Sequence, residues 1–177
     1  VCVIGTGAMG TDHIIRINTR MSGAIVTAIV EPDAKRAAES LKCAPEAKQF
    51  ASISEAIASG LVDAALVATP GPFHEEVLLP IIAAGMPVLC EKPFTINAAE
   101  AKQMKAAADK NGVALMEAMW ARFLPHMHLV REILASGVLG EILAVEADHG
   151  QRLSDYANPR HWEPSLGGGA LLDLGIY

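Results

Sequence analysis

The chain opens with Val1-Cys2-Val3-Ile4-Gly5-Thr6-Gly7-Ala8-Met9-Gly10, a β-branched apolar run that leads into a glycine-rich turn. Such a run is typical of a buried strand, and the isoleucine-rich stretch at residues 14–17 indicates a helix after the turn. The turn has the spacing G-x-G-x-x-G, in which Gly5 permits a sharp bend, Gly7 admits a pyrophosphate and Gly10 lets helix and strand pack closely. The stretch predicts a dinucleotide-binding βα unit whose helix amides face the anion, with a ligand-free glycine turn as the plainer alternative.

A carboxylate stands where this fingerprint expects one, about twenty residues beyond the glycines. Glu31 ends the second apolar run, and there it would accept hydrogen bonds from the ribose hydroxyls of adenosine. Because a carboxylate repels a 2′-phosphate, Glu31 favours NAD, while Lys35 and Arg36 on the next helix keep NADP open. Glu31 also fits an ordinary turn acid before Pro32, and a methyltransferase that binds S-adenosylmethionine would use the same loop and carboxylate.

The rest of the chain continues this alternation of strand and helix. Helix starts are indicated by Ser52 with Glu55 and by Asn97 with Glu100, which have the spacing of a capping box. Further apolar runs predict strands at residues 24–30, 64–68, 87–90, 113–116 and 142–147. Parallel strands joined by right-handed crossovers arrange this order most economically, so the predicted fold class is α/β, a doubly wound parallel sheet.

The regular alternation of strand and helix ends near Met119, where we place a domain boundary. A helix is expected at residues 124–135 and a strand at 141–148, followed by a long polar and aromatic stretch at 150–169. The predicted domains are a dinucleotide-binding domain, 1–118, and the beginning of a second α/β sheet domain, 119–177. Because the sequence starts at Val1 and stops inside a glycine-rich motif, we expect a fragment of a longer protein.

Composition excludes several classes of function. Hydrophobic residues make up 51% of the chain, which excludes disorder, and a net charge of −6 has the wrong sign for binding nucleic acid. The longest uncharged apolar stretch, 77–90, has prolines inside it and is too short to span a membrane. Three widely spaced cysteines give no disulfide framework and favour the cytoplasm. His126 and His128 would diverge on a helix, so no metal is predicted.

Two predicted strands end in residues suited to a ligand, at the edge where doubly wound sheets bind theirs. Thr69 and Pro70 are expected to line the cofactor site, whereas His74 fits a cofactor contact and the start of the next helix equally well. The next strand ends in Glu91-Lys92-Pro93. Lys92 has the charge to hydrogen-bond a substrate hydroxyl, and an ordinary loop lysine is the alternative.

A second glycine-rich motif lies near the end of the sequence. Gly167-Gly168-Gly169 precedes a predicted helix in which Asp173 and Tyr177, four residues apart, share one face. An adjacent ammonium such as that of Lys92 would stabilise a phenolate at Tyr177. The alternative is that Asp173 supports the turn and Tyr177 belongs to the core.

In this order and spacing, the glycine fingerprint, Glu91-Lys92-Pro93 and Gly-Gly-Gly-x-x-x-Asp resemble the glucose-fructose oxidoreductase, inositol dehydrogenase and MocA family over the whole chain. Many members have histidine where this chain has Tyr177. The tyrosine, together with residues 117–123, is similar to the branch that contains trans-dihydrodiol and sugar dehydrogenases. The resemblance implies a Rossmann domain and a C-terminal sheet domain in an NAD(P)-dependent oxidoreductase, NAD being favoured.

The resemblance also implies the roles of individual residues. Tyr177 would exchange the proton of a sugar, polyol or dihydrodiol hydroxyl, Lys92 would stabilise the oxyanion and Asp173 would orient them. The residues expected to bind the cofactor are Gly5, Thr6, Gly7, Ala8, Met9, Gly10, Glu31, Thr69, Pro70, His74, Glu91 and Lys92. Substrate contacts are expected from Trp120, Arg122, Arg160 and Trp162. A structural ion pair explains Arg122 equally well, and a packed surface loop explains the last two equally well.

Partners and competing functions follow from the same residues. The expected partner is a small-molecule substrate, and the full-length protein is expected to form a homo-oligomer. Two other functions stay open, a regulatory protein that senses NAD(P) without turnover and an S-adenosylmethionine-dependent methyltransferase. A sensor needs none of the three catalytic residues, and a methyltransferase leaves Glu91-Lys92-Pro93 and the glycine triplet unexplained.

Overall fold

The computed structural model describes residues 1–151 and 161–177. Arg160 therefore lies outside the described residues, as do the other residues of 152–160 within the stretch at 150–169. The chain divides into two compact units, Val1–Glu117 and Ala118–Tyr177, called unit 1 and unit 2 below.

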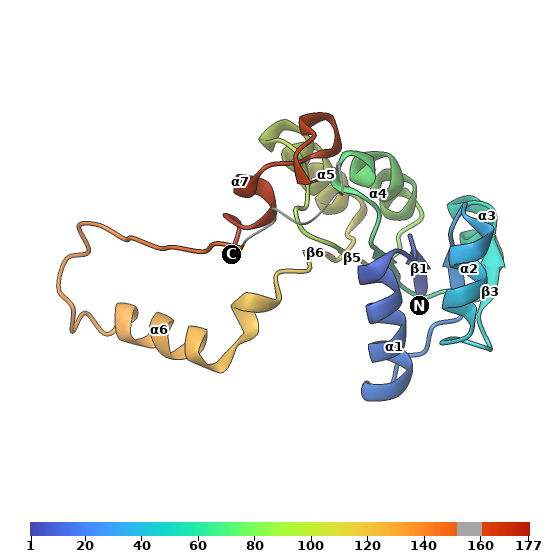
Figure 1. Cartoon of the computed structure of the whole chain (residues 1–177), viewed down its shortest axis with the longest axis horizontal. Coiled ribbons are helices and arrows are strands. Elements are labelled where there is room, and N and C mark those ends of the chain that lie inside the picture. Colours follow the sequence, from blue (N-terminus) through green and yellow to red (C-terminus); the bar gives the residue numbers. More distant parts are fainter. Residues whose placement is uncertain (152–160) are drawn as a thin grey trace. The chain divides into compact units, whose positions relative to one another are not determined.

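Unit 1 is a six-stranded parallel sheet in the order β3-β2-β1-β4-β5-β6, which confirms the doubly wound fold (Figure 1). Its elements in chain order are β1 (Cys2–Ile4), α1 (Ala8–Arg20), β2 (Ala28–Val30), α2 (Ala34–Leu41), β3 (Lys48–Phe50), α3 (Ile53–Ala58), β4 (Ala65–Val67), η1 (Gly71–Phe73), α4 (His74–Ala83), β5 (Val88–Cys90), α5 (Ala98–Asn111) and β6 (Leu115–Glu117). The strand order reverses between β1 and β4, where folds of this kind bind ligands.

Both faces of the central strands of this sheet are buried. Alternate strand residues point to opposite faces, so Val3, Ile29 and Leu66 pack with α1 and α2, and their neighbours in sequence pack with α3, α4 and α5. Helices α4 and α5 lie side by side (Figure 1). Burial on both faces explains why the central strands are continuous apolar runs, which is the pattern that predicted them.

The helix signals of the sequence also hold. The side chains of Ser52 and Asn97 accept hydrogen bonds from the backbone N–H groups of Glu55 and Glu100, which starts α3 and α5 as predicted. Gly112 ends α5 in the left-handed conformation. The short strand β3 was missed by the sequence analysis because Lys48-Gln49-Phe50 lies at the sheet edge and is largely exposed.

Unit 2 contains η2 (Trp120–Phe123), α6 (Pro125–Ala135), η4 (Pro164–Leu166) and α7 (Ala170–Asp173) in its described part. Helix α6 agrees with the helix predicted at 124–135. The strand predicted at 141–148 does not form. A strand needs a hydrogen-bonding partner, and the described residues of unit 2 contain no second strand that would pair with it.

Candidate functional site: the carboxyl edge of the sheet

The glycine-rich turn joins β1 to α1 in a geometry that excludes side chains at two of its positions. Gly5 has a positive φ of 83°, and a Cβ there would lie 3.0 Å from backbone atoms of Ala68 and Thr69. A Cβ at Gly10 would overlap the carbonyl oxygen of Gly5, so the close packing expected of Gly10 is present. Gly7, in contrast, has open space where its Cβ would be. The turn therefore leaves room for a ligand at Gly7.

Helix α1 begins beside this open space without a side chain that caps it. Its N-cap is Gly7, and its first turn holds no acidic residue. The first amides of a helix lack partners within the helix, and the helix dipole favours an anion near them. A pyrophosphate meets both conditions, so the residues present at this helix end fit a dinucleotide.

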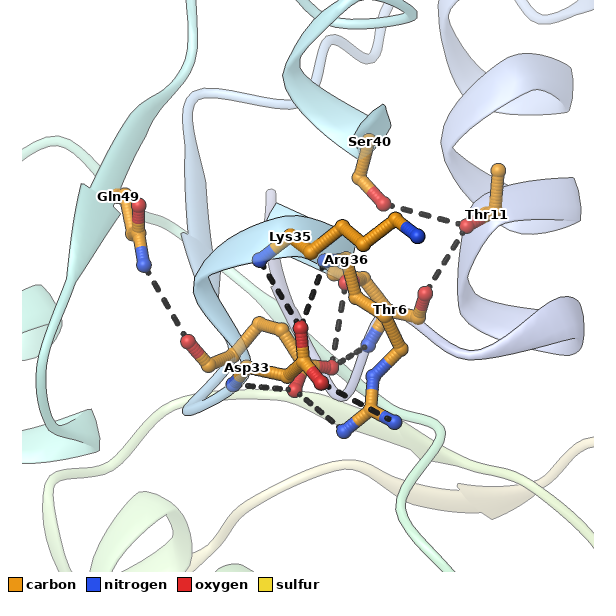
Figure 2. Close-up of polar contacts among 8 residues, drawn as sticks. Thr6, Thr11, Asp33, Lys35, Arg36, Ser40 and Gln49 are labelled. Atoms are coloured by element: carbon orange, nitrogen blue, oxygen red, sulfur yellow. Dashed lines mark hydrogen bonds and ion pairs between the residues drawn. The ribbon is translucent and has the colours of Figure 1, made fainter. Parts of the chain in front are cut away.

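A cavity of about 520 Å³ adjoins the helix end. Across its wall, the hydroxyl of Thr11 donates to the carbonyl oxygen of Thr6 and contacts the Ser40 hydroxyl at 3.2 Å (Figure 2). It is lined by Thr6, Gly7, Ala8, Thr11, Asp33, Lys35, Arg36, Glu39 and Ser40. The cavity joins the glycine turn to the start of α2, and this is the path that the adenosine half of a dinucleotide follows in doubly wound folds.

Glu31 is buried at the base of this region, and both of its carboxylate oxygens are engaged. Oε2 accepts from the N–H and the hydroxyl of Thr6, at 2.8 and 3.2 Å. Oε1 accepts from the N–H of Asp33 and from Nη2 of Arg36, both at 2.9 Å. Four donors fill the acceptor positions of a carboxylate. Glu31 therefore binds ribose hydroxyls only if one of these donors leaves, which the sequence analysis did not foresee.

The electrostatics of this carboxylate follow from the same contacts. Burial acts to raise the pKa of Glu31, but the hydrogen bonds from Arg36, Asp33 and Thr6 outweigh it and hold that pKa below its usual value. Of the donors, Arg36 is the most easily displaced because its side chain is about half exposed. Asp33 caps α2 by accepting from the N–H groups of Lys35 and Arg36 (Figure 2). Both cationic side chains thus start from the first turn of α2.

His74 lies in the interior rather than at the open edge. Its ring is 1% exposed, with Nε2 2.7 Å from the carbonyl oxygen of Thr69 and Nδ1 3.0 Å from that of Phe94. The buried thiol of Cys90 lies 3.3 Å from Nδ1, and burial raises the pKa of this thiol. His74 thus joins the loop after β4 to the loop after β5. This position favours a role for His74 in holding the two loops together over a direct contact with the cofactor.

Thr69 offers a buried polar group that the protein leaves unsatisfied. Among the described residues, its hydroxyl is the one buried side-chain oxygen or nitrogen without a hydrogen-bond partner. Buried hydroxyls nearly always have a partner, so an unsatisfied one at the ligand edge favours a bound group. Pro70, next in sequence, is exposed. That Thr69 and Pro70 line the cofactor site stays a prediction.

The segment Glu91-Lys92-Pro93 follows β5 at the same edge and contains a cis peptide bond before Pro93. The Glu91 carboxylate accepts the Lys92 N–H at 3.1 Å and lies 2.6 Å from Nε2 of His13 on α1. Farther along, the Phe94 N–H donates to Glu117 at 2.8 Å. Sequence reasoning missed His13, although a polar ring three residues after the last fingerprint glycine is a signal worth examining.

In unit 2, Tyr177 lies beyond the helix in which it was expected. Helix α7 ends at Asp173, so the prediction that Asp173 and Tyr177 share one helical face is wrong. After α7, the N–H of Gly175 donates to the carbonyl oxygen of Ala170, and the N–H of Tyr177 donates to that of Leu174. Tyr177 therefore follows α7 in a turn. The Asp173 carboxylate is 3.8 Å from Nδ1 of His161.

Aromatic residues of unit 2 surround the Tyr177 ring. Nε1 of Trp120 donates to the phenol oxygen at 3.2 Å, with ring centroids 5.4 Å apart, and His149 stacks on the ring at 5.6 Å. Trp120 thus touches the proposed acid/base group, and it is still largely exposed. Arg122 and Trp162 are also exposed.

Within residues 1–151 and 161–177, no group of three or more His, Cys, Asp or Glu side chains is arranged to hold a metal ion. In the same residues, no helix has the length and apolar character needed to cross a membrane.

Two family models match the chain. The model described as an oxidoreductase family with an NAD-binding Rossmann fold covers residues 1–119, and that of the GFO/IDH/MocA C-terminal domain covers 127–177. The glycine turn, Glu31 and Lys92 all fall within the first match, and Tyr177 falls within the second.

Similar curated proteins include inositol 2-dehydrogenase of Corynebacterium glutamicum, which is 45% identical over 84% of this chain and 44% of its own length. Trans-1,2-dihydrobenzene-1,2-diol dehydrogenase of Mus musculus is 41% identical over 99% of this chain and 52% of its own length. The chain thus spans about half the length of the curated relatives it matches.

Among solved structures, GenD2 from gentamicin A biosynthesis in complex with NAD has a TM-score of 0.81 and 28% identity, over 98% of this chain and 49% of that one. WlbA dehydrogenase of Bordetella pertussis, in complex with NADH and UDP-GlcNAcA, has a TM-score of 0.73 and 27% identity. It covers 78% of this chain and 40% of that one.

Proposed function

The chain belongs to the GFO/IDH/MocA family of oxidoreductases, and from this premise we propose that the intact protein is an NAD(P)-dependent dehydrogenase of a sugar, polyol or dihydrodiol. Unit 1 serves as the dinucleotide domain and unit 2 as the beginning of the substrate domain. The observation that carries the proposal is the carboxyl edge of the sheet, where an uncapped α1, the unsatisfied Thr69 hydroxyl and Lys92 follow β1, β4 and β5.

The residues that hold the dinucleotide come from unit 1. The first amides of α1 bind the pyrophosphate, and the open face of Gly7 admits it. The adenosine half occupies the cavity between Thr6 and Ser40. The bound nicotinamide supplies the hydride acceptor, or the donor in the reverse reaction.

The chain's own residues handle the proton and the charge on the substrate oxygen. Tyr177 takes the proton of the reacting hydroxyl, and the N–H of Trp120 orients its phenol oxygen. The Lys92 ammonium stabilises the negative charge that develops on the substrate oxygen. Asp173, with His161, orients the end of α7 that precedes Tyr177. Arg122, Arg160 and Trp162 are proposed to contact the substrate.

Specificity for the cofactor depends on the pair of Glu31 and Arg36. NAD is favoured because Glu31, once Arg36 moves aside, has an oxygen ready for the ribose hydroxyls. NADP stays possible because Arg36 and Lys35 border the same cavity, and their cations attract a 2′-phosphate.

The substrate class follows from the relatives. Inositol and trans-dihydrobenzenediol, the substrates that their names contain, are cyclic and carry neighbouring secondary hydroxyls. A compound of this kind is therefore the first choice for the intact protein. We also propose that it acts in the reducing cytoplasm, because its three cysteines are unpaired, and that it is a homo-oligomer.

The test is a substrate panel with both cofactors. The intact protein is incubated with NAD or NADP and with inositols, sugars and trans-dihydrodiols, and absorbance of the reduced nicotinamide is followed. We expect turnover of at least one cyclic polyol, sugar or dihydrodiol. Thermal stabilisation by NAD without turnover of any of them would favour the sensor, and stabilisation by S-adenosylmethionine alone would overturn hydride transfer.

A further inference from the structure

The side chain of His13 on α1 contacts the Glu91-Lys92-Pro93 segment through a hydrogen bond. It lies one turn of helix beyond the glycines, and its Nε2 is 2.6 Å from Oε1 of Glu91. Both partners are well covered, with side chains 20% and 11% exposed. In such surroundings an N–H donated to a carboxylate is stronger than the same contact at an open surface.

Glu91 uses its second oxygen on the backbone of the proposed catalytic lysine. Oε2 accepts the Lys92 N–H at 3.1 Å, so one carboxylate joins the ring of His13 to the residue that carries the ammonium. The backbone at Lys92 determines where its long side chain begins. A rotation of the Glu91 carboxyl group would therefore change the starting position of that side chain.

The fold does not depend on this contact. Helix α1 is fixed on the sheet by Ile14 and Ile17, which are buried in the core. The end of β5 is fixed by its pairing with β4 and β6, and Phe94 is anchored separately by Glu117. Loss of the His13 ring leaves these contacts in place, so its effect is expected at Glu91 and Lys92.

We propose that His13 is a positioning residue for Lys92, acting through Glu91. The contact links the helix that receives the dinucleotide pyrophosphate to the lysine that acts on the substrate. In this role His13 acts on Lys92 through Glu91, without needing a contact of its own to cofactor or substrate. This inference rests on the proposed function, because it needs a reaction in which Lys92 takes part.

The test compares His13→Ala with His13→Gln and with a matched control on the same helix. The glutamine Nε2 lies at nearly the reach of the histidine Nε2, so His13→Gln keeps the donor to Glu91. Asp12→Ala is the control, because it breaks the exposed Asp12–Arg16 ion pair one residue away without touching Glu91. All variants are made in the intact protein. Its kcat, its KM for the polyol or dihydrodiol, its Kd for NAD and its Tm are measured.

We expect His13→Ala to lower kcat about tenfold, because a small displacement of a catalytic group is costly to the reaction rate. The Kd for NAD should stay within about twofold, and His13→Gln should recover most of kcat. The control should match the wild type. If kcat in His13→Ala equals that of Asp12→Ala, or if His13→Gln is as slow as His13→Ala, the proposal is wrong.

A double-mutant cycle tests the route through Glu91. In a Glu91→Ala background, His13→Ala should cause no further loss of kcat, and full additivity would overturn the proposal. Should His13→Ala fail to fold, His13→Asn decides instead, because its shorter amide leaves Oε1 of Glu91 without the donor. A wild-type kcat in that variant would contradict the inference. Absence of turnover in the wild type would instead refute the proposed function.

Discussion

In unit 1 the apolar side chains of the central strands are covered on both faces by helices, whereas in unit 2 the apolar side chains Leu129, Ile133 and Leu134 of α6 are exposed. The proposed functional residues differ in the same way. Those of unit 1 are held by buried carboxylates and by strand ends, while Tyr177 is held by the rings of Trp120 and His149. Under the proposed function we therefore expect unit 1 to determine cofactor binding, and unit 2 to contribute a chemical group whose loss leaves that binding intact.

The largest effect is expected from Tyr177→Phe, which breaks the contribution of unit 2 alone. The ring and its packing against Trp120 and His149 remain, but the group that exchanges the proton is lost. We expect kcat to fall about a thousandfold, as is usual for a general acid or base, with the Kd for NAD within about twofold. Steady-state kinetics and calorimetric titration measure the two. A kcat within about threefold of the wild type would remove Tyr177 from the mechanism.

A pair of glycine substitutions tests whether unit 1 separates folding from binding. Gly10→Ala puts a Cβ against the Gly5 carbonyl, so urea unfolding should show a loss of about 1–3 kcal/mol in the free energy of unfolding. Gly7→Ala places its Cβ in open space and should cost much less stability while weakening NAD binding. Equal stability of the two variants would contradict the packing described for the turn.

A smaller effect is expected from Arg36→Ala, which sharpens the description of the cofactor site in unit 1. Without the guanidinium, Glu31 has an oxygen free for ribose and an unneutralised charge that repels a 2′-phosphate. We expect kcat/KM with NADP, relative to that with NAD, to fall about tenfold. Lys105→Ala, which breaks an exposed ion pair on α5, is the control and should leave the ratio unchanged. If Arg36→Ala leaves this ratio unchanged, the pair of Glu31 and Arg36 does not determine cofactor specificity.

The smallest effect concerns the stability of the fold in acid, which depends on the ionisation of Glu31. Hydrogen bonds hold its pKa in the folded protein below the ordinary 4.5, despite burial. The stability that this group contributes is therefore complete above the ordinary value and is lost as pH falls through the lower folded-state value. Glu31→Gln should reduce the free energy of unfolding at pH 7 and narrow its gap to the wild type below pH 4. A gap that is constant with pH would contradict the shift.

Most of the fold of unit 1 can be predicted from the sequence because its central strands are buried on both faces and three of its helices, α2, α3 and α5, begin with side-chain caps. The strand at Lys48–Phe50 is not predicted by the sequence, because an exposed edge strand has no continuous apolar run. At residues 141–148 the apolar run is a local signal for a strand, but a strand forms only with a partner, and the local pattern carries no information about one.

The candidate site was readable where a backbone requirement fixes the residue type, as in the glycine turn. It was not readable where function depends on contacts between distant side chains. His13 and Glu91 are 78 residues apart, and no spacing rule brings a ring and a carboxylate together over that distance. Glu31 was identified as the acid of the cofactor site, but its saturation by Thr6, Asp33 and Arg36 depends on the folded turn.

The central claim is that the carboxyl edge of unit 1 both binds the dinucleotide and supplies the lysine for chemistry. The most direct measurement is the Kd for NAD together with kcat in Lys92→Ala, made in the intact protein with its best polyol or dihydrodiol. The account predicts a kcat lower by about a hundredfold or more with a Kd within about twofold. A variant that turns over at the wild-type rate would contradict it.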